Sequence, residues 1–338
     1  MIYEEKSKKK RKKRRRRGPA AFFGRLILRL ILLVLAAGLI LYALPVGLFL
    51  TERGEDVSPA TDLDTGVFNL LILGVDNVSQ GTRRSDTLLI ASVGYQTFCL
   101  TSVLRDTMVE IPGHGMGKIN AAYNYGGAEL TMRTLNQNFG LNLTRYVVVD
   151  FATLADLINA LGGVDLSLTQ KEQDEINRIY DISLPRLTAK GYNLSDFPKV
   201  QANFSAADAD GYAPVHLDGY QALVYARIRK IDSDFGRTHR QRKLVSASLS
   251  ALKQNAWKPW LLYRLGKIAW TQVDTNLNPL EAGSLGLKIL AQGKAESLRL
   301  PADGTYEDGM FGKTWCIKPD FEKNAELLHE FIYTDWGY

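Results

Sequence analysis

The sequence predicts a layered α/β domain that follows one long apolar helix near the N-terminus. Residues 30–50 carry no charged side chain and are long enough for a helix of about 20 residues. Three short apolar runs, at residues 67–75, 87–93 and 98–104, have the length and composition of buried strands. Residues 145–168 follow as strand, helix and strand, an alternation that is typical of a sheet covered by helices.

The N-terminal residues differ in charge from the rest of the chain. Residues 1–29 contain 13 Lys and Arg and two Glu, which leaves 29 of the 42 cations and 34 of the 36 acids for the remainder. The tail therefore carries +11 and the body −5. Because a body that binds nucleic acid is expected to be basic, the sequence speaks against a nucleic-acid partner.

The uncharged run at residues 30–50 predicts a transmembrane anchor. A cleaved signal peptide is the alternative, but its apolar core is about 7–15 residues long and ends in an Ala-x-Ala site. This run is longer and lacks that site. Flanking cations stay in the cytoplasm, so we expect a single-pass protein of the cell membrane with its body outside. The basic tail is expected to lie on the anionic inner leaflet, and residues 51–66 to form a linker.

Charged residues stand where the first strands of the body end or begin. Asp76 follows the first strand, Asp86 precedes the second, and the third leads into Arg105 and Asp106. Ligands of open α/β sheets gather at strand ends, and Mg²⁺ binds one or two acids together with phosphate oxygens. We therefore expect Asp76 and Asp86 to hold Mg²⁺. The alternative for Asp76 is an ion pair with Arg84.

The next segments predict a loop, two helices and an insertion. Residues 113–120 are a glycine-rich loop with Lys118, which suggests a phosphate site without matching the NTPase motif. Helices are expected at residues 127–139 and 151–161, the second capped by Asp150, with strands at 145–149 and 164–168. Residues 171–216 are polar and irregular, and we interpret them as an insertion that is either a lid or a surface excursion.

The most distinctive stretch is cationic and spans residues 224–243. We expect Gly236 to form a tight turn between helical runs at 220–226 and 244–252, with a helix starting near Thr238. Arginines at helical spacing present paired donors to phosphate oxygens, and a helix N-terminus adds free N–H groups. We predict a cradle for a phosphate or diphosphate, and the alternative is a solvated surface with scattered ion pairs. Its cations are Arg227, Arg229, Lys230, Arg237, Arg240, Arg242 and Lys243.

The C-terminal part predicts three further elements and leaves two questions open. Helices are expected at residues 279–290 and 320–333 and a closing strand at 295–300. The aromatic residues 257–270 indicate either core or the wall of a lipid-binding groove. Cys99 and Cys316 are too few for a disulfide framework and form either one bridge or two buried apolar side chains.

Seven motifs of this chain together resemble the LytR–CpsA–Psr family of Gram-positive cell-wall enzymes. They occur in family order and cover about residues 67–251. Val103 and Leu104 stand where Ile-Pro is commoner in the family, and residues 171–216 look longer than usual. The motifs are residues 71–76, 84–87, 102–107, 118–123, 146–151, 161–164 and 225–241.

The resemblance implies an α/β/α sandwich around a mixed sheet, with the catalytic domain at residues 67–338. It also implies a phosphotransferase that moves a teichoic acid or capsular polysaccharide from polyprenyl diphosphate to peptidoglycan. In that reading Asp76 and Asp86 hold Mg²⁺, and an apolar pocket holds the prenyl tail. Diphosphate contacts are expected from Arg84, Arg105, Lys118, Arg227, Arg229, Arg237, Arg240 and Gln241.

The chemistry expected of such a site is positioning and charge neutralisation, because the diphosphate is already activated. A sugar hydroxyl of peptidoglycan would attack, with Asp106 or Asp234 as general base or as a group that only orients arginines; Arg105 completes the expected catalytic set. Two alternatives remain. One is a Mg²⁺-dependent hydrolase of prenyl diphosphates or phosphodiesters, and the other is an anchored polyanion-binding regulator without enzymatic activity.

Overall fold

The structure is a computed structural model, and it describes the body of the chain. The described residues are 66–75, 85–94, 98–189, 198–232, 234–292, 295–312 and 314–333. The predicted anchor, nearly all of the linker, Asp76 and Arg84 lie outside these ranges. Within them, no helix combines the length and the apolar character needed to cross a bilayer.

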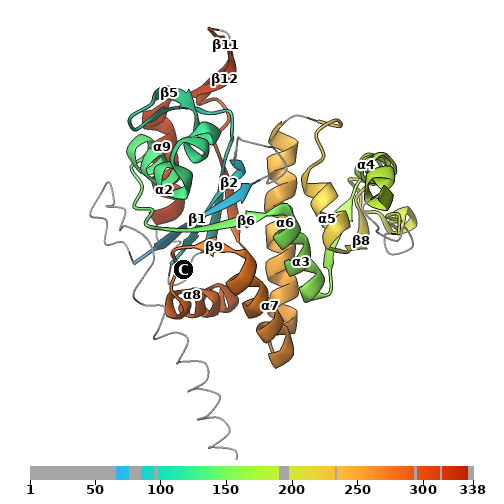
Figure 1. Ribbon diagram of the computed structural model, residues 1–338. Helices are drawn as coiled ribbons and strands as arrows, with labels where there is room; N and C mark the ends of the chain where they lie inside the picture. Colours follow the sequence, from blue (N-terminus) through green and yellow to red (C-terminus); the bar gives the residue numbers. More distant parts are fainter. Residues whose placement is uncertain are drawn as a thin grey trace, which may run out of the picture. The chain divides into compact units, whose positions relative to one another are not determined.

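A six-stranded mixed sheet forms the centre of the described domain (Figure 1). Its strand order is β10-β3-β2-β1-β6-β9. The pairs β10–β3 and β1–β6 are parallel, whereas β3–β2, β2–β1 and β6–β9 are antiparallel. The prediction of a mixed α/β fold is thus confirmed. The strands are β1 (Phe68–Val75), β2 (Ser85–Val93), β3 (Phe98–Val103), β6 (Arg145–Asp150), β9 (Asp274–Thr275) and β10 (Glu296–Leu300).

Helices cover both faces of this sheet because its strands are apolar on both sides. Leu71 and Leu73 of β1 face one way and pack with α2 (Ile119–Phe139) and α9 (Phe321–Tyr333). Leu70 of β1 faces the other way, where it packs in a cluster with residues of α6 (Asp234–Asn255) and α8 (Pro279–Ala291). Alternate side chains of one strand thus enter two cores.

A third core lies beside the sheet and was not predicted. β7 (Val164–Leu168) does not join the central sheet but pairs antiparallel with β8 (Ala213–Leu217) in a separate ribbon. Gly162 and Gly163, both at positive φ, redirect the chain after α3 (Phe151–Leu161). This ribbon packs with α3, α4 (Gln170–Ala189), α5 (Gly219–Ala226) and α6 around an apolar cluster.

Two sequence-based interpretations need correction here. Residues 171–216 are not irregular throughout, because α4 covers residues 171–189 of this range and buries Ile176 in the third core. The short helix η2 (Phe204–Ala206) follows before β8. The glycine-rich stretch 113–120 is not a loop throughout, because it contains the turn and the second strand of a hairpin. The hairpin consists of β4 (Met108–Ile111) and β5 (Gly115–Lys118), with Gly113 and Gly115 at positive φ. Another hairpin, of β11 (Tyr306–Phe311) and β12 (Thr314–Pro319), precedes α9.

The aromatic segment 257–270 is not core. It forms α7 (Pro259–Gln272), which packs on α3 and fully buries only Leu261. Trp257, Trp260 and Tyr263 expose 71%, 61% and 73% of their surface, and Trp270 exposes 50%. The cysteines follow the second of the two expectations, because Cys99 and Cys316 are both buried and unbridged.

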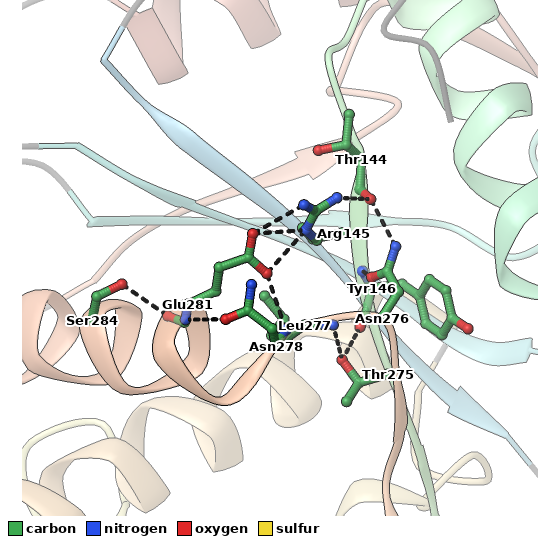
Figure 2. A network of polar contacts seen from close by, with 9 residues as sticks. All are labelled: Thr144, Arg145, Tyr146, Thr275, Asn276, Leu277, Asn278, Glu281 and Ser284. Atoms are coloured by element: carbon green, nitrogen blue, oxygen red, sulfur yellow. Dashed lines mark hydrogen bonds and ion pairs between the residues drawn. The ribbon is translucent and has the colours of Figure 1, made fainter. Parts of the chain in front are cut away.

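A polar network fixes the edge of the sheet next to α8 (Figure 2). Arg145 of β6 donates from Nε and Nη2 to the Glu281 carboxylate at 2.9–3.2 Å. The Asn276 side chain accepts from the Tyr146 amide and donates to the Thr144 carbonyl, both at 2.8 Å. These contacts hold β9 and the start of α8 against β6, which closes one side of the sheet.

Candidate functional site

The strand register brings the charged motifs to one edge of the sheet. Val75 pairs with Ser85 across β1 and β2, and Leu88 pairs with Val103 across β2 and β3. Asp86 and Arg105 therefore stand opposite one another just beyond the last pair. The parallel strand β6 ends at the same edge, where Val75 pairs with Asp150. The charged residues thus gather at the strand ends, as the sequence predicted.

Asp86 is the centre of this edge. Its Oδ1 accepts from Arg105 Nη1 at 2.8 Å, and its Oδ2 accepts from Arg229 Nη2 at 3.2 Å. Burial raises the pKa of Asp86, but the hydrogen bond from Arg105 and the charges of Arg105, Arg229 and Arg237 outweigh it and hold the pKa below the ordinary value. Arginines from three separate segments thus act on one carboxylate, and Asp86 is ionised at neutral pH.

A second carboxylate joins the hairpin to this group. Asp106 accepts from Lys118 Nζ at 2.7 Å and lies 3.3 Å from Arg105 Nε. Its backbone carbonyl accepts from the Ile317 amide of β12 at 3.0 Å. Asp106 therefore fixes the direction of two cations that sequence reasoning assigned to the diphosphate.

Arg240 is held by protein acceptors rather than exposed to a ligand. Its guanidinium donates to both carboxylate oxygens of Asp232 at 2.7 Å and to the Ile228 carbonyl at 3.0 Å, and Glu172 lies at 3.5 Å. Only 3% of the side chain is exposed. Burial lowers the pKa of Arg240, but the bonds to Asp232 outweigh this and raise it above its ordinary value. Arg240 ties the connection between α5 and α6 to α6.

The predicted turn at Gly236 is wrong, because this glycine lies within α6, close to the Asp232 side chain. α6 begins at Asp234 and runs through Gly236, so Gly236 is part of the helix. A Cβ atom on Gly236 would lie 1.9 Å from Asp232 Oδ2. The glycine is thus required for the close approach of Asp232 to α6 and not for a turn.

Three other predicted site residues lie at the end of α5 or in α6. Arg227 ends α5 and lies over the Phe151 ring, with its guanidinium carbon 4.4 Å from the ring centroid. Gln241 is half-buried on α6, four residues after the buried Arg237. Asp234 starts α6, but its side chain, like Asp76 and Arg84, is outside the described part of the structure.

Two further cations lie near this edge: Arg242, which was predicted as a cation of the cradle, and Arg299, which was not predicted as a site residue. Arg242 Nη1 donates to Ser102 Oγ of β3. Arg299 of β10 pairs in register with Ser102 and forms an ion pair with Asp303. Burial and the nearby charge of Arg299 lower the pKa of Arg242. Arg299 lies outside every cationic motif, and only the parallel register of β10 and β3 reveals its position.

Comparison with known proteins identifies the family of this chain. The LytR_cpsA_psr family model matches residues 51–325. The chain belongs to the LytR–CpsA–Psr family. It is 33% identical over 253 residues to a curated relative from Enterococcus faecalis, the polyisoprenyl-teichoic acid–peptidoglycan teichoic acid transferase TagU. The match spans 72% of this chain and 73% of that relative.

Further relatives share the fold. TagV of Bacillus subtilis, a transferase of the same description, is 28% identical over 292 residues, which span 80% of this chain and 66% of TagV. The crystal structure of B. subtilis TagT superposes with a TM-score of 0.61 at 26% identity, covering 83% of this chain and 96% of TagT. A structure of TagT bound to LI-WTA gives 0.62 at 25% identity, with coverage of 83% and 98%.

Asp86 fits as one ligand of a hard divalent cation whose other ligands include oxygens of a bound phosphate. Within the described ranges, no three His, Cys, Asp or Glu side chains are grouped to hold a metal by themselves. Mg²⁺ usually takes one or two carboxylates and completes its shell with water and phosphate oxygens. Asp86 is ionised and exposes 23% of its side chain, so it can serve as such a ligand once an anion occupies the arginines.

Proposed function

We propose that this protein is a membrane-anchored phosphotransferase. It moves a glycopolymer of the teichoic acid or capsular polysaccharide type from polyprenyl diphosphate to peptidoglycan. The observation that carries the proposal is the convergence of Arg105, Arg229 and Arg237 on Asp86 at the edge of the sheet. The names of TagU and TagV, which are transferases of teichoic acid to peptidoglycan, agree with it.

The arginines bind the diphosphate by exchanging partners. Asp86 accepts from both Arg105 and Arg229 and balances one of their two positive charges. A diphosphate brings stronger and more numerous acceptors, and the planar guanidinium groups can bind its oxygens two at a time. Arg229 exposes half of its side chain, so it can turn towards a ligand. Arg227, Lys118 and Gln241 complete the cradle in this proposal, with Arg84 from the adjacent loop.

Asp76 and Asp86 are the ligands that we assign to Mg²⁺. When bound, the ion would neutralise negative charge on the phosphate oxygens. The protein side chains then supply the positioning. Arg240, held by Asp232, fixes the start of α6 and with it Arg237. Asp106 orients Arg105 and Lys118.

The transfer step needs little covalent chemistry from the protein. A sugar hydroxyl of peptidoglycan attacks the phosphorus that carries the glycopolymer, and the bond from that phosphorus to the bridging oxygen breaks. Polyprenyl phosphate leaves and the hydroxyl loses its proton. Asp106 is engaged by two cations. We therefore assign the role of proton acceptor to the Asp234 carboxylate, three residues before Arg237.

The prenyl tail is assigned to the sheet face covered by α6 and α8. Phe68, Ile72 and Val147 on this face are only partly buried, as are Val245 and Leu249 of α6 that face them. An apolar chain bound there would remove this surface from water at about 25 cal/mol per Å². The anchor at residues 30–50 would keep the body next to the membrane that carries the lipid.

The test is product analysis with a lipid-linked glycopolymer and peptidoglycan, with and without Mg²⁺. We expect Mg²⁺-dependent attachment of polymer to peptidoglycan. Arg105→Ala should reduce transfer by at least about 10²-fold, because it removes a donor aimed at the reacting phosphate. Arg133→Ala, an exposed arginine of α2, is the matched control and should leave transfer unchanged.

Two results would contradict the proposal. Release of free polymer without attachment would identify a hydrolase. Binding of the lipid diphosphate without turnover under any condition, and with Arg105→Ala lowering binding alone, would identify a polyanion-binding regulator. Loss of transfer in a variant that still binds the lipid diphosphate would exclude the pure binder.

A further inference from the structure

The outer face of α7 combines exposed aromatic rings with positive charge. With 3.6 residues per turn, Trp260, Tyr263, Lys267 and Trp270 fall within an arc of about 80°. Leu261, the buried residue of the helix, is on the opposite side, where α7 packs on α3 (Figure 1). The aromatic residues therefore point away from the domain, as their exposed fractions of 50–73% show.

The charges on this segment have one sign. Residues 257–273 contain Lys258, Arg264 and Lys267 and no Asp or Glu. The body as a whole carries a net negative charge, so this segment differs in charge from the rest of the domain. Lys258 lies 5.4 Å from the Trp257 ring centroid, and Trp257 contacts Trp260 edge to face at 6.3 Å. Cations and indole rings are thus interleaved on one surface.

This composition fits a particular partner. Trp and Tyr prefer the membrane–water interface, where the ring is in an apolar layer and its polar group meets water. A helix with aromatic residues on its free face and Lys or Arg beside them binds anionic lipid surfaces and lies in the plane of the interface. Burial of large aromatic residues explains the apolar part, and attraction to lipid phosphates explains the absence of acids.

The length of chain before the body permits this contact. The predicted anchor ends at residue 50, and the described body begins at residue 66. A chain of that length spans at most about 50 Å when it is fully extended. The body is then tethered within reach of the bilayer, so that even a weak surface interaction is favoured by a high effective concentration.

We propose that the outer face of α7 is a membrane-docking surface that lays the body on an anionic lipid bilayer. The occupant is the lipid interface itself, with Trp257, Trp260 and Trp270 at the level of the headgroups and Arg264 and Lys267 on lipid phosphates. The contact sets the orientation of the body relative to the membrane. It is independent of the chemistry assigned to Asp86 and its arginines.

The distribution of tryptophan makes the proposal directly testable. The chain has five Trp, three of them at positions 257, 260 and 270 and none in the predicted anchor. In the double variant Trp315→Phe, Trp336→Phe, all tryptophan emission comes from the α7 segment. The full-length variant is reconstituted into vesicles of neutral lipid, or of neutral and anionic lipid mixed, with bromine on the acyl chains as quencher.

The expected result is blue-shifted emission that is quenched in anionic vesicles and recovers at high salt. Lys267→Glu in the same background should lose most of the quenching, whereas Lys318→Glu on the exposed edge of β12 should retain it. The complementary variant, with Phe at positions 257, 260, 270 and 336, reports from Trp315 of β12 alone and should show little quenching. Circular dichroism confirms that each variant is folded.

Three results would overturn the proposal. The first is unquenched α7 emission in anionic vesicles to which flotation shows the protein is bound. The second is quenching that is equal in neutral and anionic vesicles and insensitive to Lys267→Glu. The third is an emission change that requires added peptidoglycan and not lipid, which would assign the same rings to stacking on sugars. None of these three results would change the outcome of the transferase assay, which tests the site around Asp86.

Discussion

The substitution Gly236→Ala tests the contact between Gly236 and Asp232, which the sequence-based prediction of a turn at Gly236 did not include. Glycine inside a helix is less favourable than alanine by about 1 kcal/mol, so a helical glycine is normally a position to stabilise. In this helix the added Cβ would meet all three terminal atoms of the Asp232 carboxyl group, at 1.9, 2.2 and 2.6 Å. The carboxylate must move, and its two hydrogen bonds to Arg240 are lost.

The magnitude follows from the burial of the pair. Removing one partner of a buried ion pair costs about 3–5 kcal/mol, because the other charge stays buried. Arg240 is 3% exposed, but Asp232 is 37% exposed, and Glu172 lies 3.5 Å from the same guanidinium. We therefore discount the loss to about 2 kcal/mol. After the alanine gain of about 1 kcal/mol, Gly236→Ala should destabilise by about 1 kcal/mol.

The assay is urea unfolding of the full chain in detergent, followed by circular dichroism. Gly283→Ala in α8 is the matched control, because its Cβ would meet nothing within 4 Å and should stabilise by about 1 kcal/mol. In an Asp232→Ala background, Gly236→Ala has no carboxylate to displace and should also stabilise. If Gly236→Ala stabilises the wild-type chain as much as the control does, the contact between Gly236 and Asp232 does not hold the helix as described.

Three further predictions follow from the charged groups. Asp86→Asn should lower transfer by about 10²-fold or more, and wild-type turnover should show no acid limb from this carboxylate above about pH 5, because the cluster around Arg105 holds its pKa below the ordinary 3.8. Burial raises the pKa of Glu281, but the hydrogen bond from Arg145 outweighs it and leaves it below 4.5. Glu281→Gln should therefore cost about 1 kcal/mol of unfolding free energy at pH 7, a difference that disappears as the pH falls through the folded-state pKa. Arg242→Ala should weaken diphosphate binding several-fold in a titration, and unchanged binding would place Arg242 outside the cradle.

Local pattern was sufficient for much of the fold. The strands β1, β2, β3 and β6 and the helices α3, α8 and α9 were predicted to within a few residues. The strands are short apolar runs, and α3 has a capping residue in Asp150. β7 was also predicted, but its partner was not. Periodicity identifies a strand without stating which strand it pairs with, so the chain reversal at Gly162 and Gly163 could not be derived.

The sequence identified residues of the site more reliably than it identified the role of each residue. Sequence motifs named Asp86, Arg105 and Arg229, and the structure brings these three together. The motifs could not distinguish Arg240, whose partners are protein acceptors, from the arginines that face the edge of the sheet. For α7, aromatic content indicated burial, but exposure depends on the neighbouring elements, which no local pattern specifies.

The domain has an apolar core beside the sheet in addition to those on the two faces of the sheet, and this has a consequence for ligand binding. Asp86, Arg105 and Lys118 are attached to the core around the sheet, and Arg227 and Arg229 follow a helix of the core built by α3, α4 and α5. A diphosphate held by both groups links these two parts of the domain non-covalently. Saturation with such a ligand should raise the unfolding temperature of the domain, so calorimetry can report occupancy without any measurement of turnover.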